Sequence, residues 1–184
     1  MTKEAAAKIR QNQNNWQTVM DTVDHIVVTC SSCGFALMED WQSLLENEFT
    51  AGVKSKTIHI SALLNNYFDR LDLDICDLEV SYHAPCHLKI QPDPNSSIEL
   101  LSRIPGIALR DLKSHCCGMI GSWGLTADHY DLSKQIGSEM IARLNDSAAS
   151  VGVTDCPTCR MQMEQFSHKE IKHPVEIVCD CLRG

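Results

Sequence analysis

The stretch that decides the fold reads Val151-Gly152-Val153-Thr154-Asp155-Cys156-Pro157-Thr158-Cys159. Its first four residues are small or β-branched, which is typical of a strand buried in a parallel sheet. The Cys-x-x-Cys pair follows at once and therefore stands at the carboxyl end of that strand. Open α/β sheets bind their ligands at this edge. We expect an α/β fold with a parallel sheet whose strands deliver cysteine loops.

The same order of segments occurs once more near the start of the chain. Ile26-Val27-Val28-Thr29 leads into Cys30-Ser31-Ser32-Cys33, with a helical pattern on either side. Internal repetition of this kind indicates two related units. We divide the chain into residues 1–75, a partial N-terminal cysteine-rich unit, and residues 76–184, a complete C-terminal one. The first copy is expected to be truncated because no Cys-Cys pair precedes Cys30.

Apolar periodicity and capping signals outline the other elements. Strands are expected over residues 26–29, 57–60, 79–82, 107–112 and 151–154. Helices are expected over residues 3–23, after Gly34, from Ser61, from Ser96 and over residues 132–144. Ser61 is expected to cap its helix, Ser96 to Glu99 has the form of a capping box, and His173-Pro174 is expected to open a last helix.

Five cysteines in the second half of the chain form three short motifs, each of which follows an expected strand. They are Cys86, Cys116, Cys117, Cys156 and Cys159. The segments between the motifs are long enough for a strand and a helix, so we expect the three loops to converge on one site. Soft thiolates select zinc, copper(I) or iron–sulfur clusters.

The adjacent pair Cys116-Cys117 helps to choose among these metals. The two Cα atoms are about 3.8 Å apart and the side chains diverge, which hinders binding of both sulfurs to one tetrahedral ion. Several irons relax that demand, and five thiolates exceed the four that one structural zinc or one cubane cluster takes. The pattern favours an iron–sulfur site. A zinc site completed by His87 or His115 and a set of buried structural thiols stay open as alternatives.

A resemblance to a known family adds to this interpretation. It is carried by Tyr82-His83-Ala84-Pro85-Cys86-His87, Cys116-Cys117-Gly118, Val153-Thr154-Asp155-Cys156-Pro157-Thr158-Cys159 and His173-Pro174. Together these resemble the cysteine-rich (CCG) domain found in the B subunit of heterodisulfide reductases and in the iron–sulfur subunits of glycolate, lactate and glycerol-3-phosphate dehydrogenases. The likeness is greatest to the C-terminal part of the C subunit of the anaerobic glycerol-3-phosphate enzymes.

The resemblance implies a cofactor, a function and partners. It implies that Cys86, Cys116, Cys117, Cys156 and Cys159 ligate a [4Fe-4S] cluster, which is non-cubane in heterodisulfide reductases. The chain would then be an electron-transfer subunit, or a fragment of one, that passes electrons from a flavoprotein dehydrogenase subunit towards quinone, with a membrane or quinone-linked subunit as a further partner. Two alternatives are disulfide or heterodisulfide reduction at the cluster and a zinc-stabilised interaction module.

Composition limits the partners and the compartment. The formal net charge is −8, so the chain has no excess of basic residues to bind phosphates, and we expect no nucleic-acid partner. The first residues lack the apolar core of a signal peptide, and no run approaches the length of a membrane span. Ten cysteines then indicate a reducing cytoplasm. We expect any association with the inner face of the membrane to be mediated by a partner.

Ten cysteines exceed what one site needs. Cys30 and Cys33 are expected to be unligated or weakly metal-binding, because their partner loop is missing. Cys76, Cys179 and Cys181 are expected to have no special role.

Overall fold

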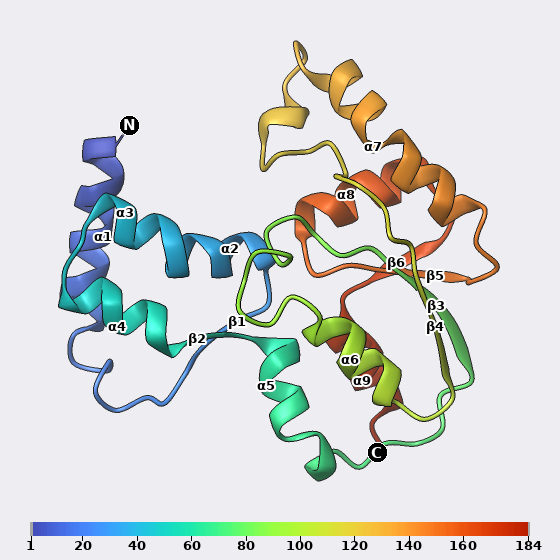
Figure 1. The fold of residues 1–184 in the computed structure, drawn as a ribbon, viewed down its shortest axis with the longest axis horizontal. Coiled ribbons are helices and arrows are strands. Elements are labelled where there is room, and N and C mark those ends of the chain that lie inside the picture. Colours follow the sequence, from blue (N-terminus) through green and yellow to red (C-terminus); the bar gives the residue numbers. More distant parts are fainter. Residues whose placement is uncertain (1, 184) are drawn as a thin grey trace.

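The computed structural model describes residues 2–183, and helices and parallel strands alternate along them (Figure 1). The helices are α1 Thr2–Trp16, α2 Ser31–Phe35, α3 Trp41–Leu44, α4 Glu48–Lys56, α5 Ile60–Asn66, α6 Ser96–Arg103, α7 Tyr130–Asn145, α8 Pro157–Phe166 and α9 Pro174–Cys181. The strands are β1 Ile26–Val28, β2 Thr57–His59, β3 Leu78–Tyr82, β4 Ile107–Asp111, β5 Val151–Val153 and β6 Glu170–Lys172. A π-helical turn, Ala36–Asp40, joins α2 to α3.

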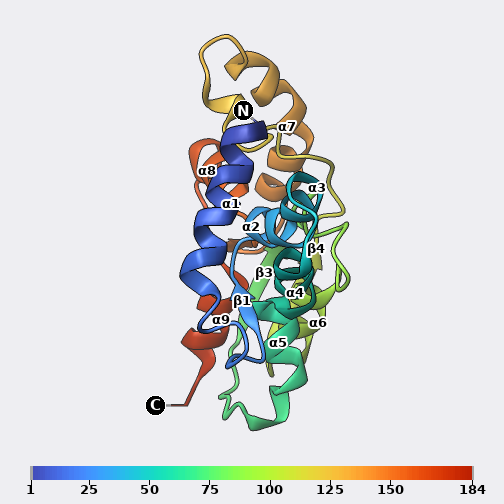
Figure 2. The ribbon, with the colours of Figure 1, turned by 90° about the vertical axis from the view of Figure 1, so that its left-hand side faces the viewer.

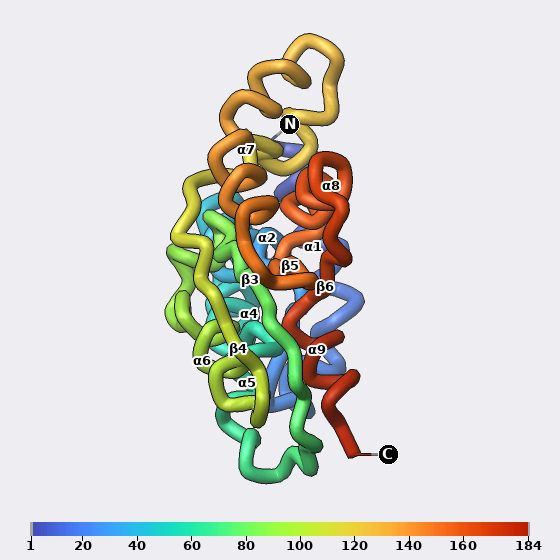
Figure 3. Tube along the Cα trace, turned by 90° about the vertical axis from the view of Figure 1, so that its right-hand side faces the viewer, coloured from blue at the N-terminus to red at the C-terminus, as the bar shows by residue number. Residues whose placement is uncertain are grey.

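Two parallel sheets form the framework. The larger has the order β4-β3-β5-β6, and the smaller pairs β1 with β2. In the larger sheet Val80 lies opposite Val151, and Tyr82 lies opposite Val153. Figure 3 shows β3 and β4 running side by side on the side of the molecule that faces the viewer. The prediction of an α/β fold with a parallel sheet is confirmed.

Helices cover both faces of the larger sheet. On one face Val80, Tyr82 and Val153 pack with residues of α6 and α9. On the other face Met140 and Leu144 of α7 pack with Met163 of α8. Gly152 makes this second contact close, because a Cβ there would lie 2.7 Å from the side chain of Ile171 and 3.0 Å from that of Leu144. Burial of these apolar side chains holds the strand ends in fixed positions.

The N-terminal part of the chain packs beside this sheet with its own small core. Helix α1, which faces the viewer in Figure 2, packs against α3, and the rings of Trp16 and Trp41 lie 5.4 Å apart. Helix α5 contacts α6, and so joins the two parts of the structure. Within residues 2–183 we find no helix that combines the length and apolar character needed to cross a membrane.

Several local predictions are wrong. The first helix ends at Trp16 and gives way to turns, where the β-branched residues Thr18, Val19 and Thr22 have lower helix propensity. Helix α4 and strand β6 were not predicted. Helix α5 is capped by His59 Nδ1, which accepts from Ser61 N, and not by Ser61. At α6 the expected capping box is absent: the N-cap is Asn95, which makes no side-chain cap hydrogen bond, and the buried hydroxyl of Ser96 has no hydrogen-bond partner among the described residues.

Two of the surplus cysteines have a structural role. Cys76 precedes β3 and Cys181 ends α9, and the two form a disulfide across a sequence separation of 105. Cys181 is buried in the core beneath α6 and α9. The expectation that these two residues have no special role is therefore wrong. Short sequence motifs carry no signal for such a pairing, because only the packing of α9 brings its last turn next to the start of β3.

Candidate functional site: a sulfur-lined cavity at the strand ends

All five cysteines of the three predicted motifs line one cavity of about 110 Å³. Cys86 lies in the loop after β3, Cys116 and Cys117 lie in the loop after β4, and Cys156 and Cys159 lie at the start of α8 after β5. The three strands are parallel neighbours, so their carboxyl ends meet at one edge. The chain thus brings together the residues that the sequence singled out.

The sulfur atoms lie close enough to share protons. Sγ of Cys159 donates to Sγ of Cys117 over 3.1 Å. Side-chain hydrogen bonds connect the thiols in the order Cys86, Cys116, Cys117, Cys159, Cys156 and Cys30. Such a continuous set of sulfurs can release protons to bind a thiophilic metal.

Hydrogen bonding divides these thiols into two kinds. Cys116 accepts from Cys117 and Cys86, which lowers its pKa to about 2, and Cys156 accepts from Cys159 and Cys30, which also lowers its pKa. Donation to Cys116 raises the pKa of Cys117 to about 12. Cys116 and Cys156 are therefore the sites where thiolate charge is already favoured before a metal binds.

The cavity is closed at its base and open at one side. Cys117, Cys156 and Cys159 are buried, Cys116 is half-buried, and Cys86 is exposed. The exposed side chain of Ile120 lies at the rim. A group bound here would be held deep among sulfur atoms and would still reach the surface near Cys86.

Two glycines permit the close approach of α7 to the Cys116-Cys117 loop. Gly118 has a φ of +89°, and a Cβ on it would lie 2.0 Å from the carbonyl oxygen of Ser133. A Cβ on Gly137 would lie 2.4 Å from the carbonyl oxygen of Cys117. Only glycine fits these positions, so the helix can press the loop against the cavity.

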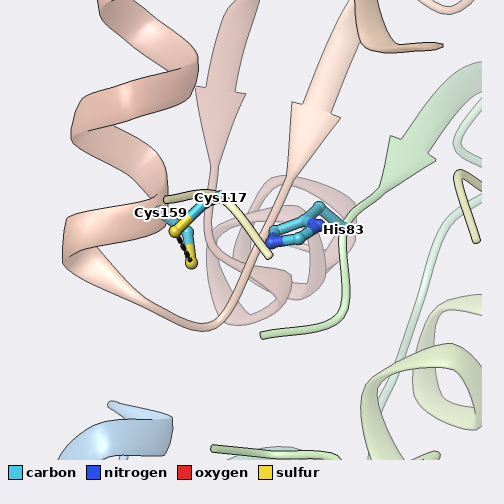
Figure 4. Close-up of side chains that lie close together, drawn as sticks. All are labelled: His83, Cys117 and Cys159. Carbon is cyan, nitrogen blue, oxygen red and sulfur yellow. Dashed lines mark hydrogen bonds between the residues drawn. The ribbon is translucent and has the colours of Figure 1, made fainter. Parts of the chain in front are cut away.

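His83 is a site residue whose place the sequence did not predict. Its ring is buried, Nδ1 pairs with Ser114 Oγ over 2.8 Å, and Nε2 has no hydrogen-bond partner among the described residues. A ring nitrogen and the sulfurs of Cys117 and Cys159 all lie within 4.8 Å of one another (Figure 4). Burial, and after it the charge of Lys89, lowers the pKa of His83 to about 4, so the ring is neutral at pH 7.

In the sequence His83 stands three residues before Cys86, the cysteine of its own loop. The ring lies instead with the sulfurs of the next two loops. Of the two histidines considered as zinc ligands, His87 lines the cavity and stacks on Phe35 at 4.9 Å. His115 is largely exposed and faces Glu139 at 3.6 Å, outside the cavity.

The Cys30–Cys33 loop lies against this site. Ser32 lines the cavity, with its Oγ 3.7 Å from Sγ of Cys156. The Cys30 thiol donates to Cys156, and this shared hydrogen bond and burial raise its pKa. Cys33 is exposed. The loop thus packs against the cysteine loops of the C-terminal part of the chain, and the expectation that its own thiols are unligated or weakly metal-binding stays a prediction.

A buried carboxylate anchors the Cys156 loop. Asp155 is fully buried and accepts hydrogen bonds from the hydroxyls of Tyr82 and Ser97, each over 2.5 Å. His59 and His173 lie at 3.8 and 4.0 Å from the same carboxylate. Nδ1 of His173 accepts from Val175 N and Nε2 donates to Thr29 O, so that ring has no free lone pair for a metal. The group therefore acts as a structural anchor.

The donor set fits a soft metal centre with several sulfur ligands. Among the described residues, those that line the cavity supply five thiols and the imidazole of His87, and no carboxylate. Hard cations such as Mg²⁺ and Ca²⁺ prefer oxygen ligands, whereas thiolates suit zinc, copper(I) and iron–sulfur clusters.

Comparisons with known proteins agree with this chemistry. Residues 80–164 match the family described as a cysteine-rich domain, so that predicted resemblance is confirmed. The chain is 32% identical to the C subunit of anaerobic glycerol-3-phosphate dehydrogenase from Escherichia coli K12, over 85% of this chain and 40% of the relative. The chain thus spans well under half of that relative's length.

Two archaeal proteins are also similar. An uncharacterized iron–sulfur protein of Methanococcus maripaludis is 26% identical over 82% of this chain and 28% of its own length. The D subunit of the dihydromethanophenazine:CoB–CoM heterodisulfide reductase of Methanosarcina acetivorans is 28% identical over 75% of this chain and 34% of its own length.

Proposed function

We propose that this chain, which carries a cysteine-rich domain in residues 80–164, is an iron–sulfur electron-transfer subunit, or part of one, in an oxidoreductase complex. Its ligands in this proposal are Cys86, Cys116, Cys117, Cys156 and Cys159. The observation that carries the proposal is that these five sulfurs line one small cavity. The occurrence of an iron–sulfur protein among the relatives supports it further.

The number and placement of the sulfurs support iron over zinc. One structural zinc takes four ligands, whereas five thiols face this cavity. Cys116 and Cys117 are adjacent in sequence and lie at different depths, which suits binding to different metal ions of one cluster. An iron–sulfur cluster, cubane or non-cubane, would supply a one-electron acceptor and donor at this place.

The residues of the chain define how such a group would be held. Cys117, Cys156 and Cys159 keep water from its base, and Cys86 leaves a path to the surface. His83 adds a neutral ring beside the sulfurs, and Asp155 fixes the start of α8 through Tyr82 and Ser97. Rigid ligand loops and a dry base are the means by which a protein sets a reduction potential.

The relatives suggest the kind of assembly. Two of the relatives are subunits of enzyme complexes, one of an anaerobic glycerol-3-phosphate dehydrogenase and one of a heterodisulfide reductase. By analogy, this chain receives electrons from a flavoprotein dehydrogenase subunit and passes them to a membrane or quinone-linked subunit. It works on the cytoplasmic side of the membrane, to which partners attach it.

Anaerobically purified protein tests the proposal. We expect iron and acid-labile sulfide, a chromophore bleached by dithionite, and reoxidation by a quinone analogue or a redox dye. A colourless protein with one zinc would support the interaction module instead. If the reduced protein cleaved a low-molecular-weight disulfide as fast as it reduced the dye, the result would support disulfide reductase chemistry. Replacement of Cys179 by serine should leave the iron, the sulfide and the chromophore unchanged, because Cys179 is an exposed free cysteine outside the cavity lining.

A further inference from the structure

We propose that Cys30 is a sixth sulfur ligand of this site, supplied by the N-terminal part of the chain and bound to the metal ion that Cys156 also binds. The inference rests on the proposed iron–sulfur function and adds a ligand to it. The five cysteines of the family motif come from the C-terminal part alone, so a sixth from outside the matched residues would tie the two parts together through the metal.

Hydrogen bonds to the main chain of Thr29 and Ser31 fix both flanks of Cys30 against the C-terminal part. Before it, the carbonyl oxygen of Thr29 accepts from Nε2 of His173 over 2.7 Å. After it, the amide of Ser31 donates to the carbonyl oxygen of Asp155 over 3.2 Å. Because both neighbours are held, the Cys30 side chain is fixed beside the first residue of the Cys156-Pro157-Thr158-Cys159 motif.

Side-chain contacts hold the remainder of the loop. Ser32 Oγ lies 2.9 Å from Nδ1 of His87, and the ring of His87 stacks on Phe35 with an interplanar angle of 3°. The Gln91 amide donates to the carbonyl oxygen of Ser31 over 2.6 Å. His87 and Gln91 follow Cys86 in sequence, so the Cys30–Cys33 loop contacts the loop of Cys86 as well as that of Cys156.

Cys30 and Cys33 differ in ways that select Cys30 as the ligand. Cys30 is half-buried, and its thiol is hydrogen-bonded to the Cys156 sulfur. Sulfurs bound to one tetrahedral ion lie about 3.7 Å apart when the metal–sulfur bonds are about 2.3 Å, which is also the range of an S–H···S contact. Replacement of the shared proton by a metal ion therefore needs little movement. Cys33 is exposed; neither of the two cysteines lines the cavity itself, so Cys30 would reach a metal ion from its place beside Cys156.

A sixth thiolate has a chemical consequence for the site. It would close the site beside Cys156, so that water or a small external thiol could not reach a metal ion there. Such a centre would exchange electrons without binding a substrate sulfur. Cys30 would thus favour electron transfer over catalysis at this centre.

The test compares Cys30→Ala with Cys33→Ala in full-length protein purified anaerobically, with 2-mercaptoethanol as the probe. In the wild type and in Cys33→Ala, added 2-mercaptoethanol should leave the EPR spectrum of the centre unchanged. In Cys30→Ala the spectrum should differ from that of the wild type before addition and shift again after it. A Cys30→Ala spectrum identical to the wild type and unresponsive to the thiol would overturn the proposal.

A second measurement needs no variant and covers the case in which Cys30→Ala fails to hold iron. In the iron-loaded wild type, iodoacetamide should modify Cys33 and spare Cys30, as read by peptide mass spectrometry. Removal of iron by a chelator should raise Cys30 modification at least 10-fold. Equal modification of Cys30 before and after iron removal would contradict its role as a ligand. Absence of iron and sulfide from the wild type would instead count against the proposed function itself.

Discussion

Sγ of Cys117 lies 3.1 Å from Sγ of Cys159, although the two residues belong to different loops. One follows β4 and the other begins α8, and both sulfurs are buried. Their contact marks the base of the cavity, where two of the three cysteine loops meet sulfur to sulfur. The properties of the site depend on this junction and on the elements that press it together.

Replacement of Cys117 by serine should reduce bound iron to less than half of the wild-type content. Serine retains the size of the side chain but lacks the soft sulfur that iron–sulfur chemistry selects. Iron and sulfide analysis after anaerobic purification measures the effect, with Cys179→Ser as the control that should keep full content. Unchanged iron in Cys117→Ser would remove this residue from the ligand set.

Gly137→Ala should displace α7 from the cysteine loop. Its new Cβ would lie 2.4 Å from the carbonyl oxygen of Cys117, which is backbone and cannot move aside alone. We expect a loss of stability on the order of 2–4 kcal/mol and loss of iron. Urea unfolding and iron analysis measure the two effects.

The control for that variant is Gly52→Ala. Gly52 lies inside α4, and its nearest neighbour beyond the helix backbone would be 3.7 Å from the new Cβ. Alanine there should be neutral or stabilising, because it has the higher helix propensity. Equal behaviour of the two variants would show that the close approach of α7 does not constrain the site.

Stability of the metal-free protein should fall as the pH drops from about 6.5 towards 4. Burial lowers the pKa of His83 from 6.5 to about 4, so in this range the unfolded chain binds a proton that the folded chain excludes. The stabilisation is complete above the unfolded pKa and is lost as pH falls to the folded one. It amounts to about 3 kcal/mol for a ring that is almost fully buried.

Urea unfolding at a series of pH values checks this dependence. His83→Gln should lose most of it, with the remainder due to His59, whose pKa burial also lowers. His168→Gln changes an exposed histidine and should keep the wild-type profile. A His83→Gln profile as steep as that of the wild type would show that His83 is accessible to protons in the folded state.

Loss of the Cys76–Cys181 disulfide should destabilise the protein by about 2–5 kcal/mol. The crosslink closes a loop with a sequence separation of 105, which restricts the unfolded chain. Thiol titration of the metal-free protein in urea without reductant should count the eight free cysteines of the structure. Dithiothreitol should then lower the urea midpoint of the wild type and leave that of Cys181→Ser unchanged. A count of ten would show that the bond does not form.

The sequence was most informative where local chemistry decides structure. Val151-Gly152-Val153 predicted a buried strand, and His173-Pro174 predicted the start of α9 with its histidine cap. The spacing of the three cysteine motifs likewise predicted that they would meet, because the carboxyl ends of neighbouring parallel strands share one edge.

The parts that the sequence did not predict depend on tertiary contacts. The approach of Cys30 to Cys156 arises from main-chain hydrogen bonds made by Ser31 and Thr29 across the two parts of the chain. His83 lies with Cys117 and Cys159 because it directly follows β3, which lies in the sheet between β4 and β5, the strands that precede the other two loops. Ser96 does not form the expected capping box, and its neighbour Ser97 donates to the buried carboxylate of Asp155. Each of these outcomes depends on a partner distant in sequence.

Metal and sulfide analysis of anaerobically purified protein, with an EPR spectrum after dithionite reduction, tests the central claim most directly. A bound cluster predicts iron and acid-labile sulfide in equal amounts, about four of each per chain for a [4Fe-4S] centre, with a paramagnetic signal in one of its oxidation states. One zinc per chain with no sulfide, or no metal at all, would contradict the claim that the five sulfurs of this cavity hold an iron–sulfur cluster.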